Sequence, residues 1–368
     1  MSKLLRRARA TSTHAALAAA AVLTVPLLLT SCSSSGSGGS RGDGTGASTG
    51  AAPAGAVTSA ITLGQVDPGL CHGKHYKIGY DTWSDTEAYT VDVNKELKAA
   101  AAETGCVDLV TLVDNADPGT AVSNIQTLVQ EHVDGVMLFQ VVAAANQGIA
   151  KILGAAKIPA ISISASAPGI PFIFPDESSA GLQAGTELGA AGKARFGSAL
   201  PYVLLGGFPE GGDNVVARMK AVLQGVEKAY PGLPSNHVLS IDTKADPATA
   251  NSNALNVLGN VPSDAPLLVS GISDSTTNAI YQAVVKDGHG RSVVVVPIGG
   301  ANPSGLQFVC QYSAYAGVLS YLPETNAKYM LSAVIARLRG QSVPAVVHTP
   351  VAYLTRQNMK QTYPSAPC

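Results

Sequence analysis

Charged residues are scarce in this sequence, and their signs balance. Asp, Glu, Lys and Arg make up 13% of the 368 residues, and the formal net charge is −1. A protein that binds nucleic acid needs a basic stripe or patch, and the sequence has no such stripe. We therefore expect neither DNA nor RNA as a partner.

Motifs of catalysis and cofactor binding are also missing. The sequence has no HExxH, GxSxG or paired CxxC pattern, and its seven histidines are scattered. The glycine-rich stretch at 207–214 matches neither GxxxxGK[ST] nor GxGxxG, so we interpret it as a loop that lets backbone approach a ligand. We predict no enzymatic activity, no cofactor and no metal, with an active site assembled from distant loops as the alternative.

A long apolar run occurs only at the start of the chain. Residues 15–29 are apolar and follow several basic residues, which is typical of a secretory signal. The next residues, LTSC, resemble the lipobox of bacterial lipoproteins, in which Cys32 becomes the lipidated first residue. We predict a signal peptide over residues 1–31 and a lipid anchor to the cell membrane, with a plain signal peptide as the alternative and the export route (Sec or twin-arginine) open. No later run reaches the ~18 residues of a membrane helix.

Residues 32–70 begin with low-complexity sequence rich in Gly, Ser and Ala. Such a composition cannot bury enough apolar surface to fold, so we predict a flexible tether.

Only four cysteines follow Cys32, and they are Cys71, Cys106, Cys310 and Cys368. An even number in an oxidising compartment predicts disulfides, with three possible connectivities. We favour Cys71 with Cys106 and Cys310 with Cys368. The alternative is a metal site, because two histidines lie within four residues after Cys71.

Apolar runs of strand length alternate with helical patterns along most of the remaining chain. They cover residues 76–80, 107–113, 134–139, 158–163, 201–206, 236–241, 266–270 and 293–298. Runs that are apolar without alternation are typical of buried parallel strands. We therefore predict an α/β fold with two Rossmann-like lobes, whose ligand site lies between loops at the carboxyl ends of both sets of strands.

The chain should cross between these lobes more than once. Residues 171–181 join the two halves, and they place Asp176 at the crossing. Near residue 321 a long helix begins, and residues 346–354 form a last extended segment. We assign residues 71–175 with about 322–347 to the N-terminal lobe, and 176–321 with about 348–368 to the C-terminal lobe. Two or three crossings make a hinge on which the lobes can close.

From about residue 76 to residue 355, the chain resembles the ribose-binding-protein type of periplasmic sugar-binding proteins. The resemblance is carried, in order, by YDTWSDTEAY, VDNADPGTAVSNIQTLVQEHVDGVML, FPDESSAG, GGFPEGGDNVVARMKAVLQGVEKAYPG, SGISDSTTNAIYQAV and SYLPETNAKYML. It implies a type 1 periplasmic binding protein fold with two lobes joined by a multi-strand hinge. It also implies an extracytoplasmic monomer that delivers a small sugar or sugar-like ligand to the permease subunits of an ABC transporter.

The resemblance assigns roles to particular residues. Trp83 and Tyr89 correspond to the aromatic region of the first lobe, and Arg218 to the arginine of the second lobe, with Lys220 as the competitor in register. Aromatic rings can stack on the C–H faces of a sugar, and a planar guanidinium can donate forked hydrogen bonds to adjacent sugar hydroxyls. The whole candidate ligand-binding set is Asp81, Trp83, Asp85, Tyr89, Gln140, Ser164, Asp176, Asn214, Arg218, Ser273, Asp274, Asn302 and Tyr321.

Two departures from the family pattern bear on the ligand. An Asp-Arg pair commonly follows the fourth strand of the first lobe, but here residues 162–166 read SISAS. A binding aspartate often follows the sixth strand of the second lobe, where this chain has two glycines. Losing both removes strong hydroxyl-binding groups, so we expect a less hydroxylated, acylated or otherwise unusual ligand.

Two alternatives stay open on the sequence alone, which are a sensor subunit and a binder of a non-sugar small molecule. A sensor subunit that presents its ligand to a membrane receptor would have the same fold. A DNA-binding regulator of the lactose-repressor type would need a helix-turn-helix at the front, where this chain has a signal and a tether.

Overall fold

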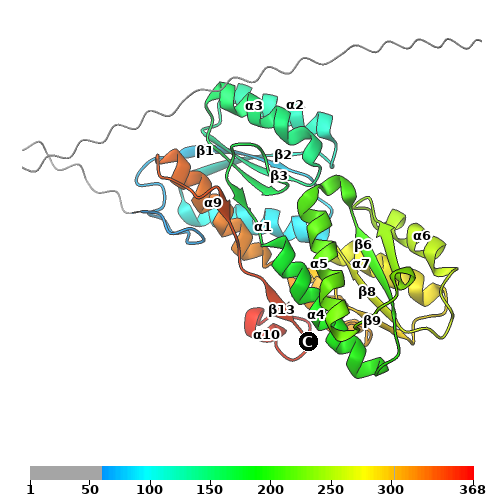
Figure 1. Cartoon of the computed structure of the whole chain (residues 1–368). Helices are drawn as coiled ribbons and strands as arrows, with labels where there is room; N and C mark the ends of the chain where they lie inside the picture. The colour runs from blue at the N-terminus through cyan, green and yellow to red at the C-terminus, as the bar shows by residue number, and fades with distance from the viewer. Residues whose placement is uncertain (1–59, 302) are drawn as a thin grey trace, which may run out of the picture. The chain divides into compact units, whose positions relative to one another are not determined.

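Figure 1 shows the computed structural model, which describes residues 60–301 and 303–368. The predicted signal peptide over residues 1–31, the predicted lipidation site Cys32 and the predicted tether up to residue 59 lie outside the described residues, as does Asn302. The described chain alternates parallel strands with helices, so the predicted α/β fold is confirmed.

The first lobe is built on a six-stranded parallel sheet with the order β12-β5-β4-β3-β1-β2. Its strands are β1 (Tyr76–Thr82), β2 (Val107–Val113), β3 (Gly135–Gln140), β4 (Ala160–Ser164), β5 (Phe172–Ile173) and β12 (Val346–Val347). Its helices are α1 (Ala88–Thr104), α2 (Pro118–Gln130), α3 (Asn146–Ala156) and α9 (Pro323–Leu338), with a 3-10 turn η1 (Ala143–Ala145). Helices α2 and α3 cover one face, and α1 and α9 cover the other (Figure 1).

The second lobe contains a four-stranded parallel sheet with the order β7-β6-β8-β9 and a three-stranded sheet with the order β10-β11-β13. The strands are β6 (Tyr202–Gly207), β7 (Val238–Asp242), β8 (Leu267–Gly271), β9 (Val293–Val295), β10 (Ile298–Gly299), β11 (Val318–Ser320) and β13 (Ala352–Leu354). The helices are α4 (Glu177–Phe196), α5 (Asp213–Ala229), α6 (Pro247–Leu258), α7 (Asp274–Lys286), α8 (Ser304–Gln311) and α10 (Met359–Thr362), with 3-10 turns η2 (Pro209–Gly211) and η3 (Ser235–His237).

Local sequence explains where these elements begin. All residues of β3, β4 and β8 are buried, as expected for parallel strands covered on both faces. The helices that follow strands often begin with an acidic or hydroxyl cap: Asp117, Asp246 and Ser273 each accept a hydrogen bond from a backbone N–H of the first turn. The result is that polar loops gather at the carboxyl ends of the strands.

The chain passes between the lobes three times: after β5, between β11 and α9, and between β12 and β13. Two of these passages lie side by side, because Phe174 N donates to the Val347 carbonyl (3.2 Å) and Thr349 N donates to the Phe174 carbonyl (3.3 Å). We predicted one extended segment over residues 346–354. The structure divides it into two short strands in different sheets, since the passage itself separates them.

Residues 61–70, which we assigned to the tether from the sequence, contact α9 and the segment after it. Ile61 N donates to Gln341 Oε1 (2.9 Å), Gly64 N donates to Ser332 Oγ (2.9 Å), and Leu70 is buried. The composition turns apolar at residue 61, which allows this packing.

The structure contains two disulfides, Cys71–Cys106 and Cys310–Cys368, which is the pairing favoured from the sequence. Within residues 60–301 and 303–368, no group of three His, Cys, Asp or Glu side chains is arranged to hold a metal ion. In that same part of the chain, no helix is long and apolar enough to cross a membrane.

Candidate functional site

A small cavity lies where loops at the carboxyl ends of the strands of both lobes meet. Its volume is about 70 Å³. One water molecule needs roughly 10–15 Å³ of cavity volume by this measure, so the cavity has room for about five water molecules. The cavity therefore suits a single small molecule. Its walls are formed by Trp83, Glu87, Tyr89, Thr90, Phe139, Val141, Ser164, Phe174, Val215, Arg218, Ala245, Ile272, Ser273, Gly299 and Tyr321.

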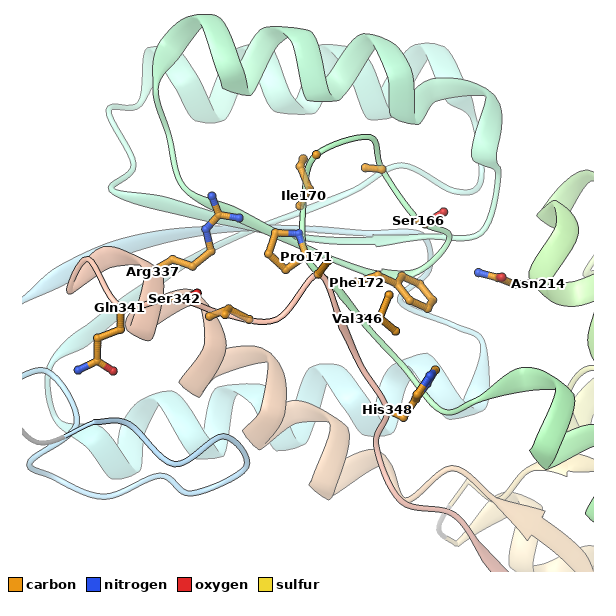
Figure 2. Close-up of a pocket in the computed structure, with 14 residues that line it drawn as sticks. Ser166, Ile170, Pro171, Phe172, Asn214, Arg337, Gln341, Ser342, Val346 and His348 are labelled. Atoms are coloured by element: carbon orange, nitrogen blue, oxygen red, sulfur yellow. The ribbon is translucent and has the colours of Figure 1, made fainter. Parts of the chain in front are cut away.

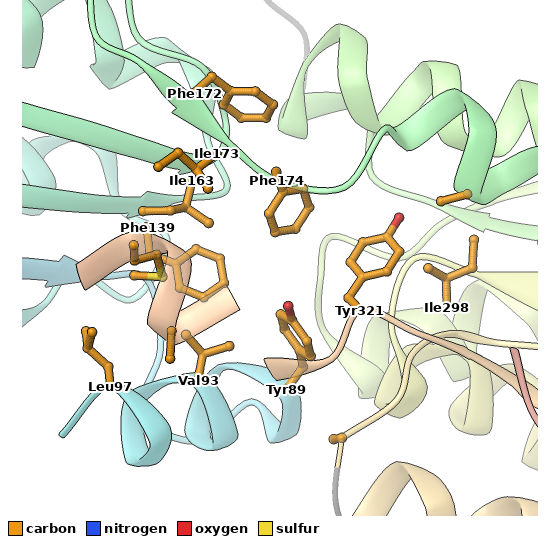
Figure 3. Packing of buried hydrophobic residues seen from close by; sticks show 14 of the residues in the cluster. Tyr89, Val93, Leu97, Phe139, Ile163, Phe172, Ile173, Phe174, Ile298 and Tyr321 are labelled. Atoms are coloured by element: carbon orange, nitrogen blue, oxygen red, sulfur yellow. The ribbon is translucent and has the colours of Figure 1, made fainter. Parts of the chain in front are cut away.

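Aromatic rings form much of this wall, and Figure 3 shows how four of them converge from different elements. Tyr89 on α1 packs edge-on against Phe139 at the end of β3, with ring centroids 6.5 Å apart. Tyr321 packs edge-on against Tyr89 (6.3 Å) and against Phe174 (5.4 Å). Phe174 and Tyr321 stand on two of the three passages between the lobes, so the hinge itself supplies part of the binding surface.

A buried ion pair lies beside these rings. Arg218 on α5 donates from Nε to Glu177 Oε2 (2.6 Å) and from Nη2 to Glu177 Oε1, while its Nη1 donates to the Ile272 carbonyl (2.9 Å). The Tyr321 hydroxyl also donates to Glu177 Oε2. The side chains of Arg218 and Glu177 are 6% and 5% exposed. Burial alone would lower the pKa of Arg218, but the adjacent Glu177 carboxylate outweighs it and raises that pKa.

Small residues let the two helices of this pair approach each other. A Cβ added to Gly181 on α4 would lie 2.2 Å from the Arg218 carbonyl oxygen, and one added to Gly185 would lie 2.0 Å from the Val222 carbonyl oxygen. Glycine removes that obstacle. Helix α5 can therefore lie directly on α4, and Arg218 reaches Glu177 at the start of α4.

Glu87 closes the outer side of the cavity. Its Oε2 accepts hydrogen bonds from Thr90 N and Thr90 Oγ1, both at 3.0 Å, so it caps α1 in the first lobe. Its Oε1 accepts from Ser275 Oγ of the second lobe at 3.5 Å. Burial raises the pKa of this carboxyl. Glu87 therefore joins the two lobes at the cavity mouth.

Asp81 and Gln140, both predicted to bind ligand, belong instead to a polar cluster behind the cavity wall. Gln140 Nε2 donates to Asp81 Oδ2 (2.5 Å) and to Asp114 Oδ2 (2.6 Å), and Asn124 Nδ2 donates to Asp81 Oδ1 (2.8 Å). Burial raises the pKa of both carboxyls. These four side chains fasten the ends of β1, β2 and β3 together.

The structure places several other predicted residues away from the cavity wall. Asp85 is exposed. Asp176 caps α4, accepting from Ser178 N (3.0 Å) and Ser179 N (3.1 Å). Asp274 is buried behind the wall, where its Oδ2 accepts from Ala301 N (2.8 Å). The Asp176 and Asp274 carboxylates therefore bind backbone N–H groups at the start of a helix and in a loop.

Asn214 lines a different hollow, which is an open groove beside the hinge (Figure 2). This groove has a volume of about 760 Å³ and runs between the loop at residues 166–171 and the end of α9, with Asn214 facing it from the second lobe.

Six of the predicted residues do line the cavity, and several lining residues were not foreseen. The predicted ones are Trp83, Tyr89, Ser164, Arg218, Ser273 and Tyr321. Arg218 is buried and lines the cavity, whereas its competitor Lys220 is exposed. Of the unforeseen residues, Phe139 is the last but one residue of β3, Gly299 is the last residue of β10, and Phe174 directly follows β5, so their position at a carboxyl end was the available signal. Glu177, which pairs with Arg218 without lining the cavity, carried no such signal.

The comparisons with known proteins agree with this architecture. A family profile described as a periplasmic binding protein domain matches residues 78–342. No curated protein matches the chain.

Among solved structures, one similar protein is an ABC transporter periplasmic solute binding protein from Actinobacillus succinogenes 130z with bound D-allose. It has a TM-score of 0.66 and 16% identity, and the match covers 78% of this chain and 99% of that one. A structure from Mycobacterium smegmatis in complex with β-D-fucofuranose has a TM-score of 0.67 and 17% identity, covering 79% and 94%. A carbohydrate transporter solute binding protein from Agrobacterium radiobacter, in complex with D-arabinose, has a TM-score of 0.66 and 19% identity, covering 78% and 97%.

Proposed function

From the premise that the chain belongs to the family of periplasmic binding protein domains, we propose that it is a solute-binding protein of an ABC transporter. It works outside the cytoplasmic membrane, to which a lipid on Cys32 anchors it. It captures one small sugar or sugar-like molecule between its two lobes and passes that molecule to the permease subunits. It binds its ligand without converting it.

The cavity between the lobes carries this proposal. It is lined by both lobes and by two of the passages between them, and its volume of about 70 Å³ suits one small molecule. Aromatic rings on its wall suit the C–H faces of a ring-shaped ligand. Because only three passages connect the lobes, they can open to admit a ligand and close on it.

The similar solved structures support a sugar-like ligand. Their titles name D-allose, β-D-fucofuranose and D-arabinose as what those proteins hold.

Isothermal titration calorimetry of the soluble body, with a panel of monosaccharides, polyols and acylated derivatives, tests the proposal. We expect one saturable ligand with a stoichiometry of one, and quantitative recovery of the unchanged ligand afterwards. Consumption of the ligand would mean catalysis, and a panel without any binder would exclude a sugar-like ligand.

Mass spectrometry of the membrane-extracted protein tests the anchor. We expect a mature chain that starts at lipidated Cys32, because a basic stretch, an apolar run and LTSC follow one another in that order. An unmodified Cys32, or cleavage elsewhere, would exclude it. Uptake of the identified ligand by cells with and without the protein then tests the partnership with a permease, and unchanged uptake would favour the sensor subunit.

A further inference from the structure

Most polar groups on the wall of the cavity already have partners within the protein. Arg218 is held by the Glu177 carboxylate and the Ile272 carbonyl, and the Tyr321 hydroxyl is held by Glu177. Glu87 accepts from Thr90, and the Ser273 hydroxyl bonds to the Thr276 hydroxyl (2.9 Å). A ligand hydroxyl would have to compete with these bonds, so the wall offers few vacant hydrogen-bonding positions.

Two polar side chains on the wall lack such partners among the residues that the structure describes. Trp83 Nε1 is buried without a hydrogen-bond acceptor. The Ser164 hydroxyl makes no side-chain hydrogen bond there, and Ser164 has a φ of +65°, an uncommon conformation for a residue other than glycine. A buried N–H without an acceptor is costly, and strained backbone concentrates at functional sites. Both observations point to a ligand atom that completes the site.

The remaining wall is apolar. Besides its aromatic rings it presents Val141, Val215, Ala245 and Ile272. A hydroxyl pressed against such side chains loses its water and gains no new hydrogen bond, which weakens binding by roughly tenfold or more. A sugar with a hydroxyl on every ring carbon would face that loss several times.

The charges on the wall add a further restriction. The positive charge of Arg218 is matched by Glu177, which accepts hydrogen bonds from Nε and Nη2, while the Ile272 carbonyl accepts one from Nη1. The other ionisable carboxyl of the wall is Glu87. A carboxylate or phosphate on the ligand would therefore meet no unpaired cation, and it would be repelled by Glu87.

We propose that the ligand is a small, uncharged ring compound with few hydroxyl groups, such as a deoxy sugar or a cyclic ether alcohol. An oxygen of the ligand accepts a hydrogen bond from Trp83 Nε1, another group contacts the Ser164 hydroxyl, and its C–H faces lie against the aromatic rings. This inference rests on the proposed function and narrows the ligand class of the same site.

Two series of ring compounds with falling numbers of hydroxyls test the inference by calorimetry. The furanose series is D-ribose, 2-deoxy-D-ribose and tetrahydrofurfuryl alcohol, and the pyranose series is D-glucose, 1,5-anhydro-D-glucitol and tetrahydropyran-2-methanol. We expect the least hydroxylated member of at least one series to bind roughly tenfold or more tightly than its parent sugar. Tightest binding by the parent sugars would overturn the inference and leave the proposed function intact. Absence of binding by all six compounds to the folded protein would overturn both.

Variants test the assigned contacts with the tightest binder of that panel. Trp83→Phe keeps a ring but removes the Nε1–H, so we expect roughly fivefold weaker binding. Tyr76→Phe is the matched control, because the Tyr76 hydroxyl is also buried without a partner but lies outside the cavity wall. Val215→Thr adds a hydroxyl at nearly constant shape, so it should shift the preference toward the more hydroxylated members. Wild-type affinity in Trp83→Phe, or an unchanged preference in Val215→Thr, would overturn the contacts proposed here.

Discussion

The buried pair of Glu177 and Arg218 allows a sharp prediction about stability. In Glu177→Gln the side chain keeps its size but loses its charge. The Arg218 side chain, which is only 6% exposed, then carries a positive charge without a carboxylate partner. Removing one partner of a buried ion pair typically costs about 3–5 kcal/mol, because the other charge remains uncompensated. For a folded body of about 300 residues, an unfolding entropy of about 2.1 cal/mol/K per residue means that each kcal/mol corresponds to about 1.5 °C of melting temperature. We therefore expect Tm to fall by roughly 5–8 °C.

The magnitude can be separated into its parts by three further variants. Asp176→Asn is the matched control: this neighbouring carboxylate caps α4 on the outside, so its loss should cost only about 1 kcal/mol. Tyr321→Phe removes one hydrogen bond to a charged group and should cost about 1.5–3 kcal/mol. Glu177→Gln combined with Arg218→Met removes both charges, so most of the lost stability should return.

Thermal unfolding followed by circular dichroism, with calorimetry to check the enthalpy, measures these four variants and Arg218→Met alone, which completes the double-mutant cycle. The reasoning is refuted if Glu177→Gln is no more destabilised than Asp176→Asn. It is equally refuted if the double variant is as unstable as the sum of the two single variants, because then no energetic coupling joins Glu177 to Arg218.

Four other predictions follow from separate features. Burial raises the pKa of Asp274 to about 7, well above the ~3.9 of an unfolded aspartate. Between these two pH values the native state binds more protons than the unfolded state, so stability should fall as the pH rises from 4 to 7. Asp274→Asn should flatten this slope in melting experiments, and an unchanged slope would contradict the role of Asp274. Gly181→Ala should displace α5 and weaken ligand binding. Gly154→Ala is the control, because nothing lies within 4 Å of the new Cβ, and it should leave stability unchanged or raise it. Equal behaviour of the two variants would argue against the close contact between α4 and α5. Cys310→Ser with Cys368→Ser opens a loop of 58 residues and should cost about 4 kcal/mol in the chain-entropy model, which chemical denaturation can measure against the intact protein. X-ray scattering of ligand-free and saturated protein should reveal a contraction on binding, and identical profiles would mean that the lobes do not move.

The sequence predicted the fold well because parallel strands and capped helices leave local signals. Residues 135–139 and 266–269 are apolar without alternation, and each predicted run overlaps a strand of the structure. The candidate site was harder, because lining residues come from helix starts whose orientation a sequence does not reveal. Asp176 was predicted as a site residue and Glu177 was not. The two are neighbours, about 100° apart around the helix, yet Asp176 caps α4 on the outside and Glu177 points inward and pairs with Arg218.

The hinge passages limited the prediction in another way. Phe174 and residues 348–351 have no helical or alternating pattern, since their conformation is fixed by contacts with each other. Their part in the site became visible only when distant segments were placed side by side. The same holds for Ser275, whose contact with Glu87 joins residues 188 positions apart.

The packing of residues 61–70 on α9, together with the Cys71–Cys106 bridge, has a mechanical consequence. Both attachments belong to the first lobe, so a pull on the chain at residue 60 is borne by that lobe alone. The second lobe carries none of this load. Tension at residue 60 therefore does not oppose the proposed closure of the two lobes on a ligand.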